Sequence, residues 1–131
     1  MTLASAAAGD APVVLGSRAF AAPHGEGWGA ARPARIFNGG DPSGLVTHIR
    51  WSSWGAASAT GYGETFIFKP RGGYYDEPAR IELRAHGLGS CSPSGPPAYT
   101  ELSVRVPAHP GGPLGPWMSW SGARSICEAG L

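Results

Sequence analysis

The stretch that decides the fold is WSSWGAASATGYGETFIF, residues 51–68. Two of the chain's five tryptophans precede a run of small residues, which leads into a strand predicted over residues 57–68. One face of that strand carries small residues such as Ala59, Gly61 and Gly63. Such a face lets a neighbouring backbone or an aromatic ring approach closely, and glycines in a strand also mark bulges. The stretch therefore indicates a β protein, and it contains no recognised catalytic motif.

Alternation of polar and apolar residues predicts further strands on both sides of this stretch. We expect strands at 13–15, 35–37 and 45–51, and a last strand region at 117–127. Residues 79–86 and 99–106 alternate most clearly, and we expect them to be neighbours whose outward charges pair across the ladder. The side chains expected to point inward from these two strands are Ala79, Ile81, Leu83, Ala85, Thr100, Leu102, Val104 and Val106. Those expected to point outward from 99–106 are Tyr99, Glu101, Ser103 and Arg105, and those expected to share one face of 45–51 are Leu45, Thr47, Ile49 and Trp51.

Length and composition place these strands in one domain. A chain of 131 residues fits a single domain, and its 21 glycines and 13 prolines fit long turns between short strands. The sequence shows no convincing helical period over ten residues or more. We therefore predict an all-β, single-domain antiparallel β-sandwich or small barrel of about six strands, with an irregular segment before residue 33.

The cysteines and the first residues bear on the cellular compartment. Cys91 and Cys127 predict one disulfide, with a pair of unlinked buried thiols as the alternative. Residues 1–12 are typical of a signal-peptide remnant, because Ala4-Ser-Ala6 has the small-x-small form of a cleavage site, or of a disordered tail. We expect the remaining residues, 13–131, to form a single secreted β domain.

A resemblance is carried by Ile49, Trp51, Trp54 and Gly55, followed by the A-x-G-x-G pattern of residues 59–63. The chain resembles a group of small secreted actinobacterial proteins with the motif I-x-W-x-x-W-G…A-x-G-x-G, and the likeness extends loosely over residues 32–127. The resemblance implies export and an all-β fold, and it implies no activity. The loop at residues 70–78 departs from the short form of these proteins, so individual specificity is expected there.

Charge and motif spacing argue against several function classes. With a net charge of +1 and dispersed basic residues, the chain has no electrostatic feature for nucleic acid and no apolar run for membrane insertion. The histidines, His24, His48, His86 and His109, lack zinc-like spacing to other ligands, and no glycine-rich phosphate loop precedes a helix. We therefore expect no metal and no cofactor, and no catalytic residue is assigned.

Two kinds of hydrolase active site remain open as alternatives, although the sequence contains no motif for either. A serine could act with the distant His86 and Asp76 as a triad. Glu82 and Glu101 fall on one face of neighbouring strands, as a pair of glycosidase carboxylates would. Arginines at adjacent outward positions favour a salt-bridged surface there instead.

Aromatic residues are the main candidates for a contact surface. Trp54, Tyr74, Tyr75 and Trp117 are candidate binding aromatics, because exposed rings beside polar groups recognise sugars and proteins; packing within the domain is the alternative. The leading prediction is a secreted, non-enzymatic binding module for another secreted protein or a cell-wall glycan, centred on Tyr74 and Tyr75. The alternatives are a small secreted hydrolase with a discontinuous site and a protease inhibitor that presents the loop at 90–97.

Overall fold

The structure, a computed structural model, describes residues 12–128. The signal remnant predicted at residues 1–12 therefore lies outside the described residues, apart from Pro12. Within the described range there is no α-helix, and no helix is long and apolar enough to cross a membrane. The elements in chain order are β1 (Val14–Leu15), η1 (Arg18–Phe20), β2 (Ile36–Phe37), η2 (Pro42–Gly44), β3 (Leu45–Trp51), β4 (Ala59–Thr65), β5 (Ala79–Gly89), β6 (Ala98–Arg105), β7 (Met118–Ser119) and η3 (Trp120–Gly122), where η marks a short 3-10 helix.

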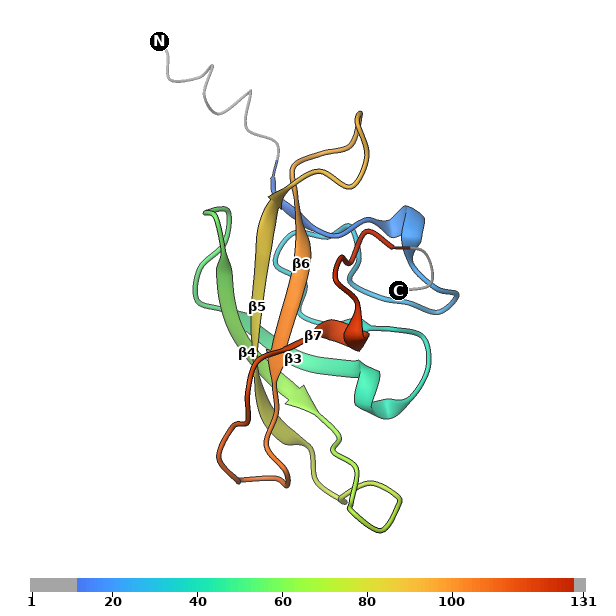
Figure 1. The fold of residues 1–131 in the computed structure, drawn as a ribbon, viewed down its shortest axis with the longest axis vertical. Coiled ribbons are helices and arrows are strands. Elements are labelled where there is room, and N and C mark those ends of the chain that lie inside the picture. Colours follow the sequence, from blue (N-terminus) through green and yellow to red (C-terminus); the bar gives the residue numbers. More distant parts are fainter. Residues whose placement is uncertain (1–11, 129–131) are drawn as a thin grey trace.

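The seven strands form one sheet in the order β1-β6-β5-β4-β3-β2, and β7 pairs with β6 as well. Strands β2 to β6 are successive antiparallel neighbours, whereas β1 runs parallel to β6. The sheet curls into an open half-barrel (Figure 1). The predicted all-β class is confirmed. The sandwich is not confirmed, because the strands of the described residues belong to one mixed sheet rather than two facing antiparallel ones.

The hydrophobic core lies against one face of the curled sheet. In β5 every second side chain from Ala79 to Ala85 is buried, as the alternation predicted. The segments that precede β3 and follow β6 in the sequence complete the core, and they contribute buried side chains such as Leu15, Trp28, Trp120 and Ile126. Figure 1 shows the two segments, blue and red, on the same side of the sheet.

Two glycines of β4 permit the close approach that their spacing predicted. A Cβ atom on Gly61 would lie 2.7 Å from the carbonyl oxygen of Arg50, and one on Gly63 would lie 2.8 Å from a methyl carbon of Val46. A side chain at either position would force β3 away from β4. The strand itself is shorter than the predicted 57–68, because residues beyond Thr65 enter a loop.

Strict alternation is wrong for β3. The register with β4 shifts within the strand, and His48 there adopts a left-handed φ of 54°. This bulge buries Val46 and Ile49, which stand three residues apart rather than two or four. The predicted common face is therefore wrong for Leu45, Thr47, Ile49 and Trp51.

The outward orientation expected for Tyr99 is also wrong. Tyr99 is completely buried, and burial in β6 resumes at Leu102, so the two-residue period breaks between them. The Tyr99 hydroxyl donates to the carbonyl oxygen of Ala56 at 2.6 Å and accepts from the N–H of Gly55 at 2.7 Å. The ring thus holds the β3–β4 loop over one end of the core.

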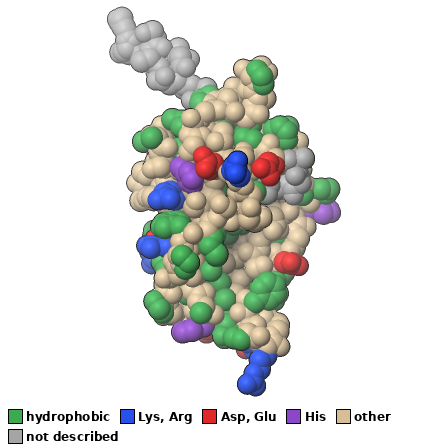
Figure 2. All heavy atoms as spheres, viewed as in Figure 1, with side chains coloured by type: hydrophobic (Ala, Val, Ile, Leu, Met, Phe, Trp, Pro, Cys, Tyr) green, Lys and Arg blue, Asp and Glu red, His purple; other side chains and the backbone are tan. Residues whose placement is uncertain are grey.

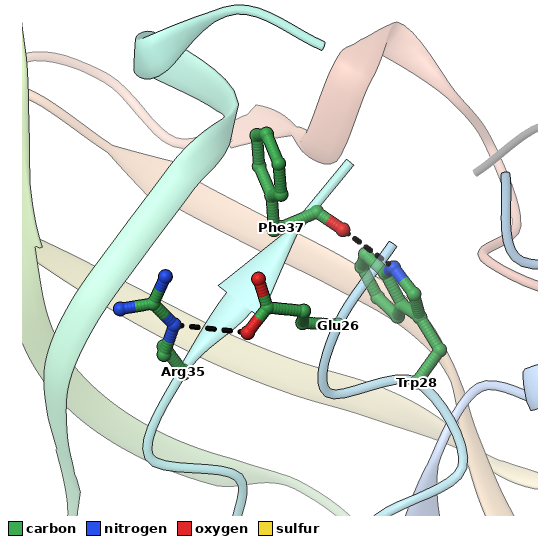
Figure 3. A network of polar contacts seen from close by, with 4 residues as sticks. All are labelled: Glu26, Trp28, Arg35 and Phe37. Carbon is green, nitrogen blue, oxygen red and sulfur yellow. Dashed lines mark hydrogen bonds and ion pairs between the residues drawn. The ribbon is translucent and has the colours of Figure 1, made fainter. Parts of the chain in front are cut away.

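The irregular N-terminal segment is fixed to β2 by polar contacts, which Figure 3 shows. The indole N–H of Trp28 donates to the carbonyl oxygen of Phe37 at 3.0 Å. Beside it, Nε of Arg35 donates to a carboxylate oxygen of Glu26 at 2.9 Å. These bonds let a segment with little regular structure cover the core.

The strand predicted over 117–127 is wrong beyond β7. The chain turns into η3, where Ser121 has a left-handed φ of 52° and Trp120 enters the core 5.9 Å from the ring of Trp28. The predicted disulfide is confirmed: Cys91 and Cys127 are bonded, with their Cα atoms 5.3 Å apart. The bond ties the segment after η3 to the β5–β6 loop.

Candidate binding surface

The outer face of the sheet carries the polar half of the alternating strands. Because β5 buries its small and apolar side chains, those of Arg80, Glu82, Arg84 and His86 project to the opposite face. The register with β6 sets Glu82 opposite Arg105, and Nη2 of Arg105 lies 2.6 Å from the Glu82 carboxylate. The expected pairing of these strands and of their outer charges is confirmed.

Trp117, one of the predicted binding aromatics, lies on this face directly before β7. The guanidinium carbons of Arg84 and Arg105 each stand 5.0 Å from the centre of its ring. Nearby on the same sheet, the guanidinium of Arg80 stands 4.1 Å from the ring centre of Tyr62. Such contacts contribute about 0.5–1 kcal/mol each at exposed sites. They favour the observed positions of the rings and the charges, and we call these five residues the arginine–aromatic cluster.

A second group on the outer face joins β5 and β6 through hydrogen bonding. Nε2 of His86 lies 2.9 Å from the hydroxyl of Ser103, and Nδ1 of the same ring lies 3.8 Å from a carboxylate oxygen of Glu101. Asp76, the carboxylate considered with His86 from the sequence, lies instead in the β4–β5 loop. The acid that faces His86 is Glu101.

Trp54 has the contacts of a packing residue. Its ring is partly buried, 4.7 Å from the centre of Trp51 and 5.0 Å from that of Tyr99. Its indole N–H donates to the carbonyl oxygen of Val13 at 2.7 Å. Both its apolar surface and its single donor are therefore engaged within the domain.

Tyr74 and Tyr75 lie in the loop between β4 and β5, as expected. Tyr74 stacks on Phe68 with ring centres 4.3 Å apart. Tyr75 lines an open hollow of about 430 Å³ together with Asp76 and Glu77, and with His109 and Pro110 of the β6–β7 loop. Figure 1 shows the two loops at the same end of the sheet. The four predicted aromatics thus occupy three different surroundings.

Sequence analysis missed the arginine partners of the aromatics and the His86–Ser103 contact. The alternation did place Glu101, Ser103 and Arg105 on the outer face. Which of them meet residues of β5 depends on the strand register, and the sequence of either strand alone does not determine it.

Comparison with known proteins adds no assignment. No known protein family, curated protein or solved structure matches the chain. The resemblance to secreted actinobacterial proteins stays a prediction. Within residues 12–128, no group of three or more His, Cys, Asp or Glu residues is placed to hold a metal ion.

Proposed function

We propose that this chain is a secreted binding module whose partner is another secreted protein, and that the partner docks on the arginine–aromatic cluster around Trp117. The observation that carries the proposal is the placement of Trp117 with two guanidinium groups at 5.0 Å. Tryptophan, tyrosine and arginine dominate the binding energy of protein–protein interfaces. Rings and charges that are already ordered lose less conformational entropy when a partner binds.

The same contacts favour a protein over a glycan. A sugar-binding platform needs an aromatic ring open to the ligand. Here guanidinium groups lie close over both Tyr62 and Trp117. A protein can use the ring edges, the arginines and the Glu82–Arg105 pair together. Figure 2 shows one side of the molecule, on which basic, acidic and apolar side chains are mixed without a broad field of one sign. Such a surface favours recognition by local contacts.

Trp117 takes the central place that we expected for Tyr74 and Tyr75. Tyr74 already stacks on Phe68, and Lys69 lies 5.8 Å above the ring of Tyr75. Their loop contributes a hollow, whereas Trp117, itself in the loop directly before β7, is flanked by arginines of β5 and β6. Side chains on strands are held more precisely than side chains on loops, so these arginines give the Trp117 surface its fixed part.

Export is the second part of the proposal, and the Cys91–Cys127 bond supports it. Structural disulfides persist in oxidising compartments and are rare where thiols are kept reduced. The resemblance to exported proteins also supports export of this chain.

Capture from culture supernatant of a likely host tests the proposal. We would immobilise the oxidised wild type, Trp117→Ala and the control Phe68→Ala, which removes an aromatic that is 53% exposed and lies in the β4–β5 loop. We expect one enriched protein whose capture falls at least about tenfold with Trp117→Ala and is unchanged with Phe68→Ala. Circular dichroism verifies that both variants fold. Equal capture by Trp117→Ala, retention of polysaccharide alone, or no specific capture would each overturn the proposal.

A further inference from the structure

The outer face also holds the three parts of a nucleophilic site. The Ser103 hydroxyl is 2.9 Å from Nε2 of His86, and Nδ1 of His86 is 3.8 Å from the Glu101 carboxylate. We propose that Ser103 is a nucleophile toward carboxylic esters, with His86 as its general base and Glu101 as a positioning residue. This inference goes beyond the binding function and does not depend on it.

The sheet register brings the three residues together. His86 on β5 lies directly opposite Glu101 on β6, and Ser103 follows two residues later on the same face of β6. The ring of His86 therefore reaches the carboxylate across the ladder and the hydroxyl along the diagonal. A nucleophile bonded to a base, which is in turn oriented by a third group, is the arrangement that activates serine. The Nδ1–carboxylate distance is longer than a hydrogen bond, as is common before substrate binds.

The carboxylate selects the tautomer that catalysis needs. A negative charge facing Nδ1 favours a proton on that nitrogen, which leaves the lone pair of Nε2 directed at Ser103. The serine hydroxyl then donates its hydrogen bond to His86, so its proton is already aligned for transfer. Ser103 is 9% exposed while the His86 side chain is 27% exposed, so the pair is shielded but reachable from the histidine side.

The reaction conserves atoms and protons with water as the only co-reactant. Oγ of Ser103 bonds to the ester carbonyl carbon as its proton passes to Nε2 of His86. The carbon–oxygen bond to the alcohol breaks, and His86 gives the proton to the departing alcohol. Water then attacks the acyl-serine, again through His86, releases the acid and restores Ser103.

Neighbouring residues indicate the class of ester. Arg84 lies directly opposite Ser103 on β5. We therefore assign its guanidinium the role of stabilising the carbonyl oxygen that becomes negative during the reaction. The guanidinium of Arg84 also contacts the ring of Trp117. An ester whose apolar group packs along the edge of the Trp117 ring therefore fits this arrangement best.

Labelling with an alkyl fluorophosphonate tests the proposal on the folded, oxidised protein alone. The probe phosphonylates an activated serine and releases fluoride. We expect one adduct, located on Ser103 by peptide mass spectrometry, and its rate of formation should fall at least about 100-fold in His86→Asn. Ser94 is exposed in the β5–β6 loop. Ser94→Ala should therefore label like the wild type, whereas Ser103→Ala should lose both the adduct and the hydrolysis of p-nitrophenyl butyrate.

Glu101→Gln tests the positioning role separately. Slower labelling should accompany a change in the ¹⁵N shifts of the His86 ring that reports loss of the Nδ1–H tautomer. Absence of an adduct on Ser103, equal labelling of urea-unfolded protein, or an unchanged rate in His86→Asn would each refute the site. Because the assay contains no partner protein, its failure is distinguishable from failure of the binding proposal.

Discussion

Tyr99→Phe should weaken the fold by a calculable amount, because it deletes one oxygen atom and leaves the ring in place. That oxygen makes two hydrogen bonds, to the carbonyl of Ala56 at 2.6 Å and from the N–H of Gly55 at 2.7 Å. Each contributes about 0.5–1.5 kcal/mol net, and water can partly replace them because Gly55 and Ala56 are exposed. We expect a loss of about 1–2 kcal/mol. With an unfolding entropy of about 2.1 cal/mol/K per residue, the Tm should fall by about 4–7 °C.

Thermal and urea unfolding followed by circular dichroism measure this loss. The matched control is Tyr62→Phe, which removes a hydroxyl from the outer face and keeps the ring under Arg80. It should change stability by less than about 0.5 kcal/mol. Hydrogen exchange at the Gly55 amide should accelerate only in Tyr99→Phe. A Tm change below about 1 °C, or equal changes in both variants, would refute the role assigned to the Tyr99 hydroxyl.

Three further perturbations test other contacts of the fold. Replacing Cys91 and Cys127 together with alanine should lower the free energy of unfolding by about 3.8 kcal/mol through loop-closure entropy, or the Tm by about 14 °C. Reduction of the wild type should lower the Tm by the same amount, and a loss under 3 °C would contradict a stabilising role of the disulfide. Gly63→Ala should destabilise by about 1–3 kcal/mol, measured by urea unfolding, because its Cβ would meet Val46 at 2.8 Å. Gly89→Ala, where the nearest atom would be 3.9 Å away, is the control, and equal losses would argue against close packing of β3 on β4. Glu82→Gln should cost no more than about 1 kcal/mol and less at high salt, since both partners of the pair with Arg105 are over a third exposed; a salt-independent loss above 2 kcal/mol would mean that the pair is shielded from water.

The sequence predicted orientation well where side chains differ strongly between the two faces. β5 alternates small or apolar residues with charged ones, so burial alone determines its inner face. In β3 and β6 the observed burial departs from two-residue alternation for physical reasons. A bulge at His48 changes which residues of β3 contact the core. Tyr99 is buried rather than directed outward, because its hydroxyl forms two hydrogen bonds inside the domain. A two-residue alternation in the sequence predicts neither the bulge at His48 nor the burial of Tyr99.

Much less of the candidate surface was predictable. Trp117 was identified as an aromatic of interest, but its partners Arg84 and Arg105 come from strands whose relative offset only the folded sheet determines. The same holds for His86 with Ser103. Trp54 and Tyr74 show the opposite case, because their sequence context left both exposure and packing open, and the fold provides each with a ring partner.

The parallel pairing of β1 with β6 also implies an order of assembly. Strands β3 to β6 are sequential neighbours, so each can add to the one before it across a short or moderate loop. Val14 pairs with Ala98 in the parallel pair, and the strands β2 to β5 lie between these two residues in the sequence. Contacts so distant in sequence carry a large loop-closure entropy and form late. We therefore expect β1 to join a sheet that is already built. Refolding rates should then respond to substitutions in the β4–β5 hairpin, and unfolding rates to substitutions at Val14 and Leu15.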